Sequence, residues 1–117
     1  MSRPILNVRE PWASLIVNGC KTIETRNYYI PEDYIGVPIY IAATNTPGKT
    51  KIIGNVIFGD CFEYGSKKEF RMDVNEHLIE KGSKYDWKRG KWGWEIDDAW
   101  AITPFKAPKR GRVWGKT

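Results

Sequence analysis

Cysteine and histidine are scarce in this sequence of 117 residues, which limits the kinds of site that it can build. It has two cysteines, Cys20 and Cys61, and one histidine, His77. Two thiols without paired spacing make neither a disulfide scaffold nor a zinc site, and a single imidazole does not suit a metal cage of protein ligands. We therefore expect reduced thiols, no structural metal and no cofactor.

Long hydrophobic runs are also missing. No apolar stretch approaches the roughly 18 residues that a membrane-spanning helix needs. Near the N-terminus, polar residues such as Arg3 and Asn7 interrupt the apolar ones too early for the core of a signal peptide. We expect an intracellular protein that does not bind membranes, in the cytoplasm or, in a eukaryote, in the nucleus.

Apolar and aromatic residues, by contrast, are plentiful. Hydrophobic residues make up 41% of the chain and aromatic residues 14%, with six tryptophans. That is enough for a packed core in a chain of this length. Because we find no repeat and no low-complexity segment, residues 1–117 are predicted to form a single domain, and we expect a monomer.

The basic residues are unevenly distributed, and their positions matter more than the net charge of +5. One cluster consists of Lys84, Lys88, Arg89 and Lys91, and the segment that contains it has a single acidic residue, Asp86. The final segment, 104–117, has no acid and contains Lys106, Lys109, Arg110, Arg112 and Lys116. Such clusters favour phosphate groups, although each alone also suits a solvated loop or tail.

Runs of β-branched and aromatic residues predict short strands at 5–8, 21–26, 37–43, 52–62, 92–97, 99–103 and near 113–114. Gly54 and Gly59 predict bulges or close backbone approach within the longest strand. Short, bent strands with few helices are typical of a small closed or nearly closed β-barrel. We therefore predict an α+β fold that is mainly β.

Two segments have helical signals. Trp12, Leu15 and Ile16 share one helix face and predict a helix over 11–18, with Pro11 at its first position. A second, largely polar helix is predicted over 67–81, with Ser66 as its cap and Gly82 ending it.

Three charged residues, Lys21, Glu24 and Arg26, follow the first helix. Alternation along a strand would place Glu24 and Arg26 on one face and Lys21 on the other. Lys21 can join them only from the turn before the strand, which Gly19 allows. Together they could hold phosphate or carbonyl oxygens and supply an acceptor or base. The charge pattern alone favours a solvated surface ion-pair network.

Aromatic rings lie beside both basic clusters. Rings can stack on unpaired bases while cations contact the backbone of a nucleic acid. Trp87 and Trp114 best suit such a ligand wall, whereas we expect at least two of Trp92, Trp94 and Trp100 in the core. A catalytic dyad of a cysteine with His77 has weak support, because His77 falls on a polar helix where we expect it to be exposed.

Two consecutive motifs follow the first predicted strand: Pro11-Trp12-Ala13-Ser14-Leu15-Ile16 and Gly19-x-Lys21-x-x-Glu24-x-Arg26. They resemble the signature of the ASCH domain, a PUA-like domain named for activating signal cointegrator 1, whose C-terminal domain is the most similar. The resemblance continues through 39–43, Gly54-x-Val56-x-x-x-Asp60-Cys61 and Pro108-x-x-Gly111-x-x-Trp114, and it is weakest over 66–91.

The resemblance implies a PUA-like barrel with a short helix after the first strand, one or two peripheral helices, and a basic cleft lined by the motif. The class is associated with RNA, other nucleic acids and modified nucleosides. The residues that would bind nucleic acid are Trp12, Lys21, Glu24, Arg26, Arg110, Arg112 and Trp114.

Some relatives of this domain hydrolyse N4-acetylcytidine with a lysine, a threonine and a glutamate. Lys21 matches that lysine, but Glu24 stands where the threonine is expected, and Thr22 or Thr25 could replace it. Other relatives are ribonucleases.

We therefore predict a module that binds nucleic acid, RNA or single strands above all, in transcription or RNA processing. In the alternative, a hydrolase acting on a modified nucleoside or on RNA, Lys21 would be the base and Glu24 would carry protons. A third hypothesis, a protein-interaction domain, predicts a large exposed apolar patch away from the cleft.

Overall fold

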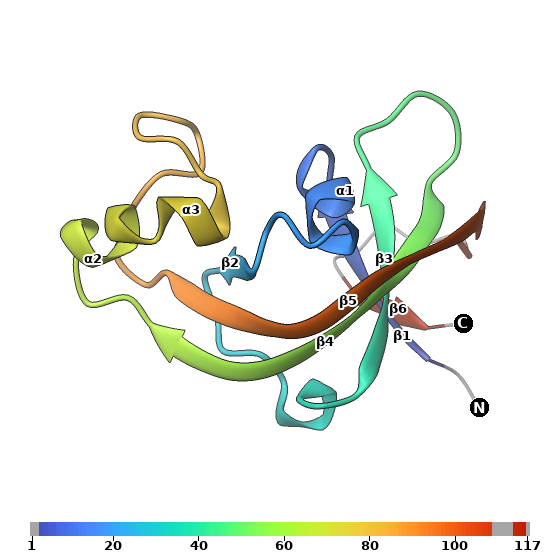
Figure 1. Ribbon diagram of the computed structural model, residues 1–117, viewed down its shortest axis with the longest axis horizontal. Helices are drawn as coiled ribbons and strands as arrows, with labels where there is room; N and C mark the ends of the chain where they lie inside the picture. The colour runs from blue at the N-terminus through green and yellow to red at the C-terminus, as the bar shows by residue number, and fades with distance from the viewer. Residues whose placement is uncertain (1–2, 109–113, 117) are drawn as a thin grey trace.

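The computed structural model describes residues 3–108 and the backbone of residues 114–116 (Figure 1). Its elements, in chain order, are β1 (Pro4–Arg9), α1 (Trp12–Val17), β2 (Ile23–Arg26), the 3-10 turn η1 (Glu32–Tyr34), β3 (Pro38–Thr44), β4 (Lys51–Glu63), α2 (Lys67–Met72), α3 (Val74–His77), β5 (Trp92–Lys106) and β6 (Trp114–Lys116). None of the helices described is long and apolar enough to cross a membrane.

The strands form one mixed sheet in the order β2-β5-β4-β3-β1-β6. The β1–β3 pair is parallel and the other pairs are antiparallel. β4 and β5 run side by side through a long curve that carries the sheet from one end of the molecule to the other (Figure 1). Within the described residues no pairing joins β2 to β6, so the sheet stays open. The α+β class is confirmed, whereas the predicted barrel is only approximate.

The strands predicted at 92–97 and 99–103 are one continuous strand, β5, because β4 pairs with it along its whole length. Register shifts near Gly54 and between Phe58 and Cys61 bend the pair without ending it. A Cβ atom at Gly54 would lie 2.5 Å from the carbonyl oxygen of Trp100 and 2.5 Å from a methyl carbon of Val17. The close approach predicted at Gly54 is therefore present, and it lets α1 pack directly on the sheet.

The main core lies between α1 and the sheet. Ala13, Ile16 and Val17 of α1 are buried against residues that include Phe58 and Trp94. Fully burying a valine or isoleucine side chain contributes about 1.5–3 kcal/mol to the stability of the fold. The packing therefore fixes α1, and with it the turn that follows, against the strands that carry the rest of the motif.

The first helix begins one residue later than predicted. Pro11 is its N-cap, and the Glu10 carboxylate accepts hydrogen bonds from the backbone N–H of Ser14, at 2.8 Å, and from its hydroxyl. Glu10 thus satisfies a donor that the first turn of a helix leaves free.

The second predicted helix is two short helices. The Ser66 cap is present, since its hydroxyl accepts from the backbone N–H of Glu69 at 3.1 Å. The helical run breaks at Asp73, and α3 ends at His77, before its C-cap Leu78, whose φ is +61°, so the predicted continuation to Lys81 is wrong. α2 and α3 lie beyond the β2 end of the sheet, as peripheral helices (Figure 1).

His77 is fully buried, which corrects the expectation that it is exposed. Its ring stacks on Phe70 with centroids 4.2 Å apart. Its Nδ1 accepts from the backbone N–H of Ile79 at 2.9 Å, and its Nε2 lies 2.6 Å from the carbonyl oxygen of Phe70. These bonds fix a neutral imidazole with the proton on Nε2 and leave neither nitrogen to activate a cysteine.

Candidate functional site

The turn between α1 and β2 places Lys21 beside the strand residues of the motif. Gly19 has a φ of +80°, a conformation that favours glycine. The backbone N–H groups of Cys20 and Lys21 then both donate to the carbonyl oxygen of Leu15, at 2.9 and 3.0 Å. The strand predicted over 21–26 therefore begins only at Ile23, and Lys21 lies in the turn before it, the position from which its side chain can reach Glu24.

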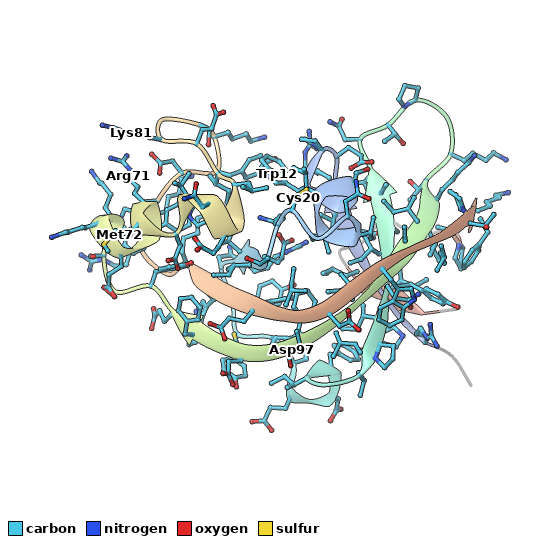
Figure 2. All side chains as sticks on the ribbon, viewed as in Figure 1. Trp12, Cys20, Arg71, Met72, Lys81 and Asp97 are labelled. Carbon is cyan, nitrogen blue, oxygen red and sulfur yellow. The ribbon has the colours of Figure 1, made fainter. Side chains whose placement is uncertain are left out.

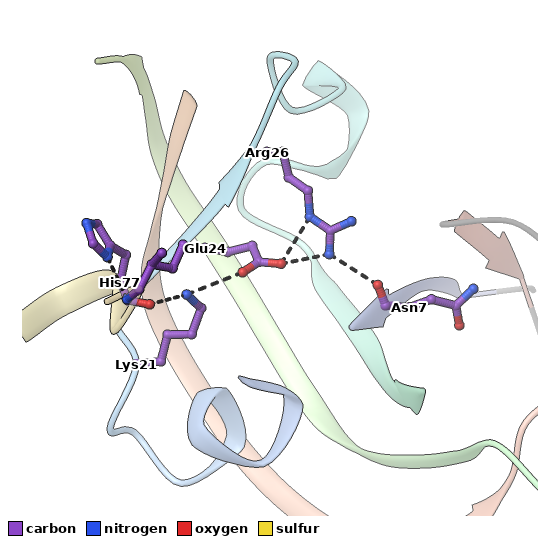
Figure 3. A network of polar contacts seen from close by, with 6 residues as sticks. Asn7, Lys21, Glu24, Arg26 and His77 are labelled. Atoms are coloured by element: carbon purple, nitrogen blue, oxygen red, sulfur yellow. Dashed lines mark hydrogen bonds and ion pairs between the residues drawn. The ribbon is translucent and has the colours of Figure 1, made fainter. Parts of the chain in front are cut away.

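Lys21, Glu24 and Arg26 converge in one network (Figure 3). The Oε2 atom of Glu24 accepts from Nε and Nη2 of Arg26, at 3.0 and 2.7 Å, and Oε1 lies 3.6 Å from Nζ of Lys21. Lys21 also donates to the carbonyl oxygen of His77, and Arg26 donates to that of Asn7 at 3.1 Å.

The network is buried, which overturns the expectation of a solvated surface ion pair. The side chains of Lys21, Glu24 and Arg26 are 1%, 7% and 16% exposed. Three charges in such a place need one another and the backbone carbonyls as partners, because an unpaired buried charge is strongly unfavourable. Lys21, Glu24 and Arg26 thus form a buried charged cluster, which we call the charged floor because a pocket opens over it.

The pKa values of Lys21 and Glu24 are both lowered, for different reasons. Burial lowers the pKa of Lys21, and the attraction of Glu24 offsets only part of that effect. Burial by itself would raise the pKa of Glu24, but Arg26 and Lys21 together outweigh it, so that pKa lies below its ordinary value. Glu24 is therefore ionised at neutral pH and holds both cations in place.

A pocket of about 830 Å³ opens over this floor. Its described lining contains a single carboxylate, Glu24, and seven cations: Arg9, Lys21, Arg26, Lys84, Lys88, Arg89 and Lys91. Trp12 and Tyr85 form an aromatic wall, with ring centroids 5.1 Å apart and planes at 86°. The pocket is thus strongly cationic and has apolar rings beside the charges.

The far wall of the pocket is the segment between α3 and β5, which we call the basic loop (residues 78–91). Asp86 holds this loop in shape. Its carboxylate is 2.6 Å from Nη2 of Arg71 on α2 and accepts from the backbone N–H groups of Gly82 and Trp87, at 2.8 and 2.7 Å. Bonds to Arg71 and to these N–H groups lower the pKa of Asp86 well below its usual range.

Four of the predicted binding residues, Trp12, Lys21, Glu24 and Arg26, line this one pocket. Arg110 and Arg112 lie outside the described residues. For Trp114 only the backbone is described, paired with Leu6 of β1. A role for these three residues in binding stays a prediction.

Of the three tryptophans from which at least two were expected in the core, Trp94 is fully buried in it and Trp92 packs against it partly buried, whereas Trp100 is 37% exposed. Trp87, predicted as a ligand wall, lies outside the pocket and packs near Phe70. Tyr85 was not singled out, and its position inside a basic loop is the only sequence signal that could have identified it. No cluster of metal-ligating side chains occurs within residues 3–108.

Comparison with known proteins identifies the family. The model of the ASCH domain matches residues 6–104, while a search of the curated proteins found no match. Among solved structures, ASCH from Zymomonas mobilis is 22% identical, with a TM-score of 0.73 over 89% of this chain and 73% of that chain. A mutant of the same protein is 19% identical, with a TM-score of 0.77 over 97% of this chain and 86% of that chain. At such identities the likeness shows a shared fold. The family model spans most of the sequence, and the chain therefore belongs to the ASCH domain family.

Proposed function

We propose that this ASCH domain binds single-stranded nucleic acid, RNA above all, through the 830 Å³ pocket. The observation that carries the proposal is the composition of the lining, in which seven cations surround one carboxylate that is itself already paired. A cleft with so large an excess of one charge attracts polyanions and concentrates them near its mouth.

Five of the seven cations fall into two groups with different roles. Lys84, Lys88 and Arg89 are exposed on the basic loop, where they can meet the phosphates of an approaching strand. Lys21 and Arg26 lie on the buried floor and present fixed charges to whatever enters the pocket. Neutralising phosphates releases counterions, so binding should weaken steeply as salt is added.

The aromatic wall supports a preference for unpaired bases. Trp12 and Tyr85 are both half-buried, so part of each ring is accessible from the pocket. An unpaired base can lie against such rings, whereas the bases of a duplex are stacked on one another and unavailable. A pocket of this size also suits one nucleotide and is too small to enclose a double helix.

Glu24 is best described as an orienting residue. Both of its carboxylate oxygens are engaged by Arg26 and Lys21, which leaves little capacity for reading an amino group on a base. Its role would be to hold the two cations in the geometry that a phosphate or a base carbonyl requires.

Fluorescence anisotropy with labelled single-stranded RNA, the matching DNA and the RNA duplex tests the proposal. We expect binding of the single strands at low salt, with RNA preferred, weaker binding of the duplex, and a steep loss of affinity with added salt. Failure to bind any of the three at low salt would reject a nucleic-acid function.

A modified nucleoside as substrate is the second candidate, and two observations favour it. Lys21 is a buried amine with a lowered pKa, and Thr25, unlike Thr22, is part of the pocket lining. The protein should be incubated with N4-acetylcytidine beside a Lys21→Ala variant. Turnover by the unmodified protein alone supports hydrolysis, whereas no turnover, or equal turnover by the variant, rejects it.

A further inference from the structure

A second hollow of about 510 Å³ adjoins the pocket. The two share Arg89 and Gly90 in their linings, so the end of the basic loop next to β5 forms the rim between them. The second hollow is completed by the end of β4 and the start of α2, through Glu63, Tyr64, Gly65, Ser66 and Lys67, and by Trp87 of the loop.

The basic loop presents one aromatic ring to each hollow. Tyr85 lines the pocket and Trp87 lines the second hollow. Between them, Asp86 is anchored to Arg71 and to the backbone N–H groups of Gly82 and Trp87. Trp87 packs at a tilt against Phe70, with centroids 6.1 Å apart, and is still half-exposed.

The charges of the second hollow differ from those of the pocket. Lys67 and Arg89 are cationic, but Glu63 brings a carboxylate to the same place. A phosphate is therefore better accommodated at the Arg89 rim than deep in the hollow. A base, which has polar edges and an aromatic face but no charge, suits the space beside Trp87.

From this arrangement we infer that the domain binds a strand rather than a lone nucleotide, with one nucleotide in the pocket, its linking phosphate over Arg89, and the adjoining base stacked on Trp87. The inference rests on the proposed function and adds the length and path of the strand. It gives Trp87 a part in binding from a position outside the pocket.

Competition anisotropy tests the inference with unlabelled uridylates and adenylates, from the mononucleotide to the hexamer. Two variants are compared with the unmodified protein: Trp87→Leu, which keeps an apolar contact for Phe70 but cannot stack, and Trp87→Phe, which keeps a ring. We expect Trp87→Leu to weaken the affinity for a hexamer by about tenfold and the affinity for the mononucleotide, which occupies the pocket alone, by less than about twofold. Trp87→Phe should restore most of the affinity for the hexamer.

The other outcomes separate this inference from the proposed function. If every length loses affinity equally, or none does, while oligomers still bind, the second position is absent and only the inference fails. If no oligomer binds the unmodified protein, the proposed function fails with it. Photo-crosslinking of 4-thiouridine oligomers to the unmodified protein needs no variant. Crosslinks at Trp87 support the path, and crosslinks confined to the pocket overturn it.

Discussion

Lys21 and His77 are 56 positions apart in the sequence and are joined directly, because the ammonium of Lys21 donates a hydrogen bond to the backbone carbonyl of His77 (Figure 3). The bond ties the turn after α1 to the end of α3. The charged floor and the helices that lead into the basic loop are therefore built as one unit.

Lys21→Ala should lower the free energy of unfolding by about 3 kcal/mol, because it removes one partner of a buried ion pair. The change would leave the carbonyl oxygen of His77 without this donor and remove one of the two cations on Glu24. Urea denaturation followed by circular dichroism measures the loss. Lys81 is an exposed loop residue outside the pocket lining (Figure 2), and Lys81→Ala should change the free energy of unfolding by less than about 0.5 kcal/mol. A Lys21→Ala variant as stable as the unmodified protein would show that the contacts of Lys21 contribute nothing to stability.

His77 should make the domain sensitive to mild acid. Burial lowers its pKa below the ordinary 6.5, and nearby Lys21 adds to the effect, while the Phe70 carbonyl, Asp73 and Glu76 oppose it. As the pH falls below 6.5 the unfolded chain takes up this proton before the folded one, so stability is lost by up to about 1.4 kcal/mol per pH unit until the folded pKa is reached.

The variant His77→Gln, which keeps one donor and one acceptor, isolates this effect. Urea midpoints measured between about pH 7.5 and pH 5 should fall less for the variant than for the unmodified protein. Protonation of Glu24 lowers the free energy of unfolding only below the ordinary pKa of 4.5, so it does not affect a comparison made above pH 5. Parallel curves for the two proteins would contradict the assignment.

Lys88→Ala and Arg89→Ala should each weaken binding of single-stranded RNA and reduce the slope of log affinity against log salt by about 1. Both side chains line the pocket and are exposed, so removing either costs phosphate contacts without disturbing the core. Lys81→Ala is the matched control, since it removes the same charge from the same loop outside the pocket. An equal effect of all three variants would indicate a diffuse charge effect instead of a site.

Arg71→Ala should loosen the basic loop and weaken binding, although Arg71 lines neither hollow. The change removes the ion pair that holds Asp86, and Asp86 in turn accepts from the N–H groups of Gly82 and Trp87. Hydrogen exchange measured by NMR should show those two amides exchanging faster while β4 and β5 stay protected. Unchanged exchange together with unchanged affinity would remove Arg71 from the account.

Local patterns predicted the motif end of the site. The 3.6-residue spacing of Trp12, Leu15 and Ile16 predicts α1, and Gly19 predicts the turn from which Lys21 reaches Glu24. These inferences hold because helix periodicity and glycine conformation are properties of a few neighbouring residues. The burial of the three charges was not predictable, since it depends on Asn7 and His77, which are distant in the sequence.

The other half of the pocket arises from tertiary packing. The i+4 spacing of Phe70, Val74 and Leu78 predicted one helix, but Asp73 breaks it and His77 turns inward to bond two backbone groups. That packing sets where the basic loop begins and brings Tyr85 against Trp12. Similarly, the alternation of apolar and polar residues could not show that β5 is continuous. The register shift near Gly54 lets β5 bend while it stays paired with β4, and such a bulge interrupts the alternation.

Chemical-shift mapping on isotope-labelled protein, titrated with short single-stranded RNA, tests the central claim most directly. The account predicts shifts confined to the residues around the pocket and the second hollow, above all the indole N–H of Trp12 and the amides of the motif turn, β2 and the basic loop. The middle of β4 and the η1 turn, which line neither hollow, should not shift. Saturable shifts on another face, or no shifts at low salt, would contradict the claim that this pocket binds nucleic acid.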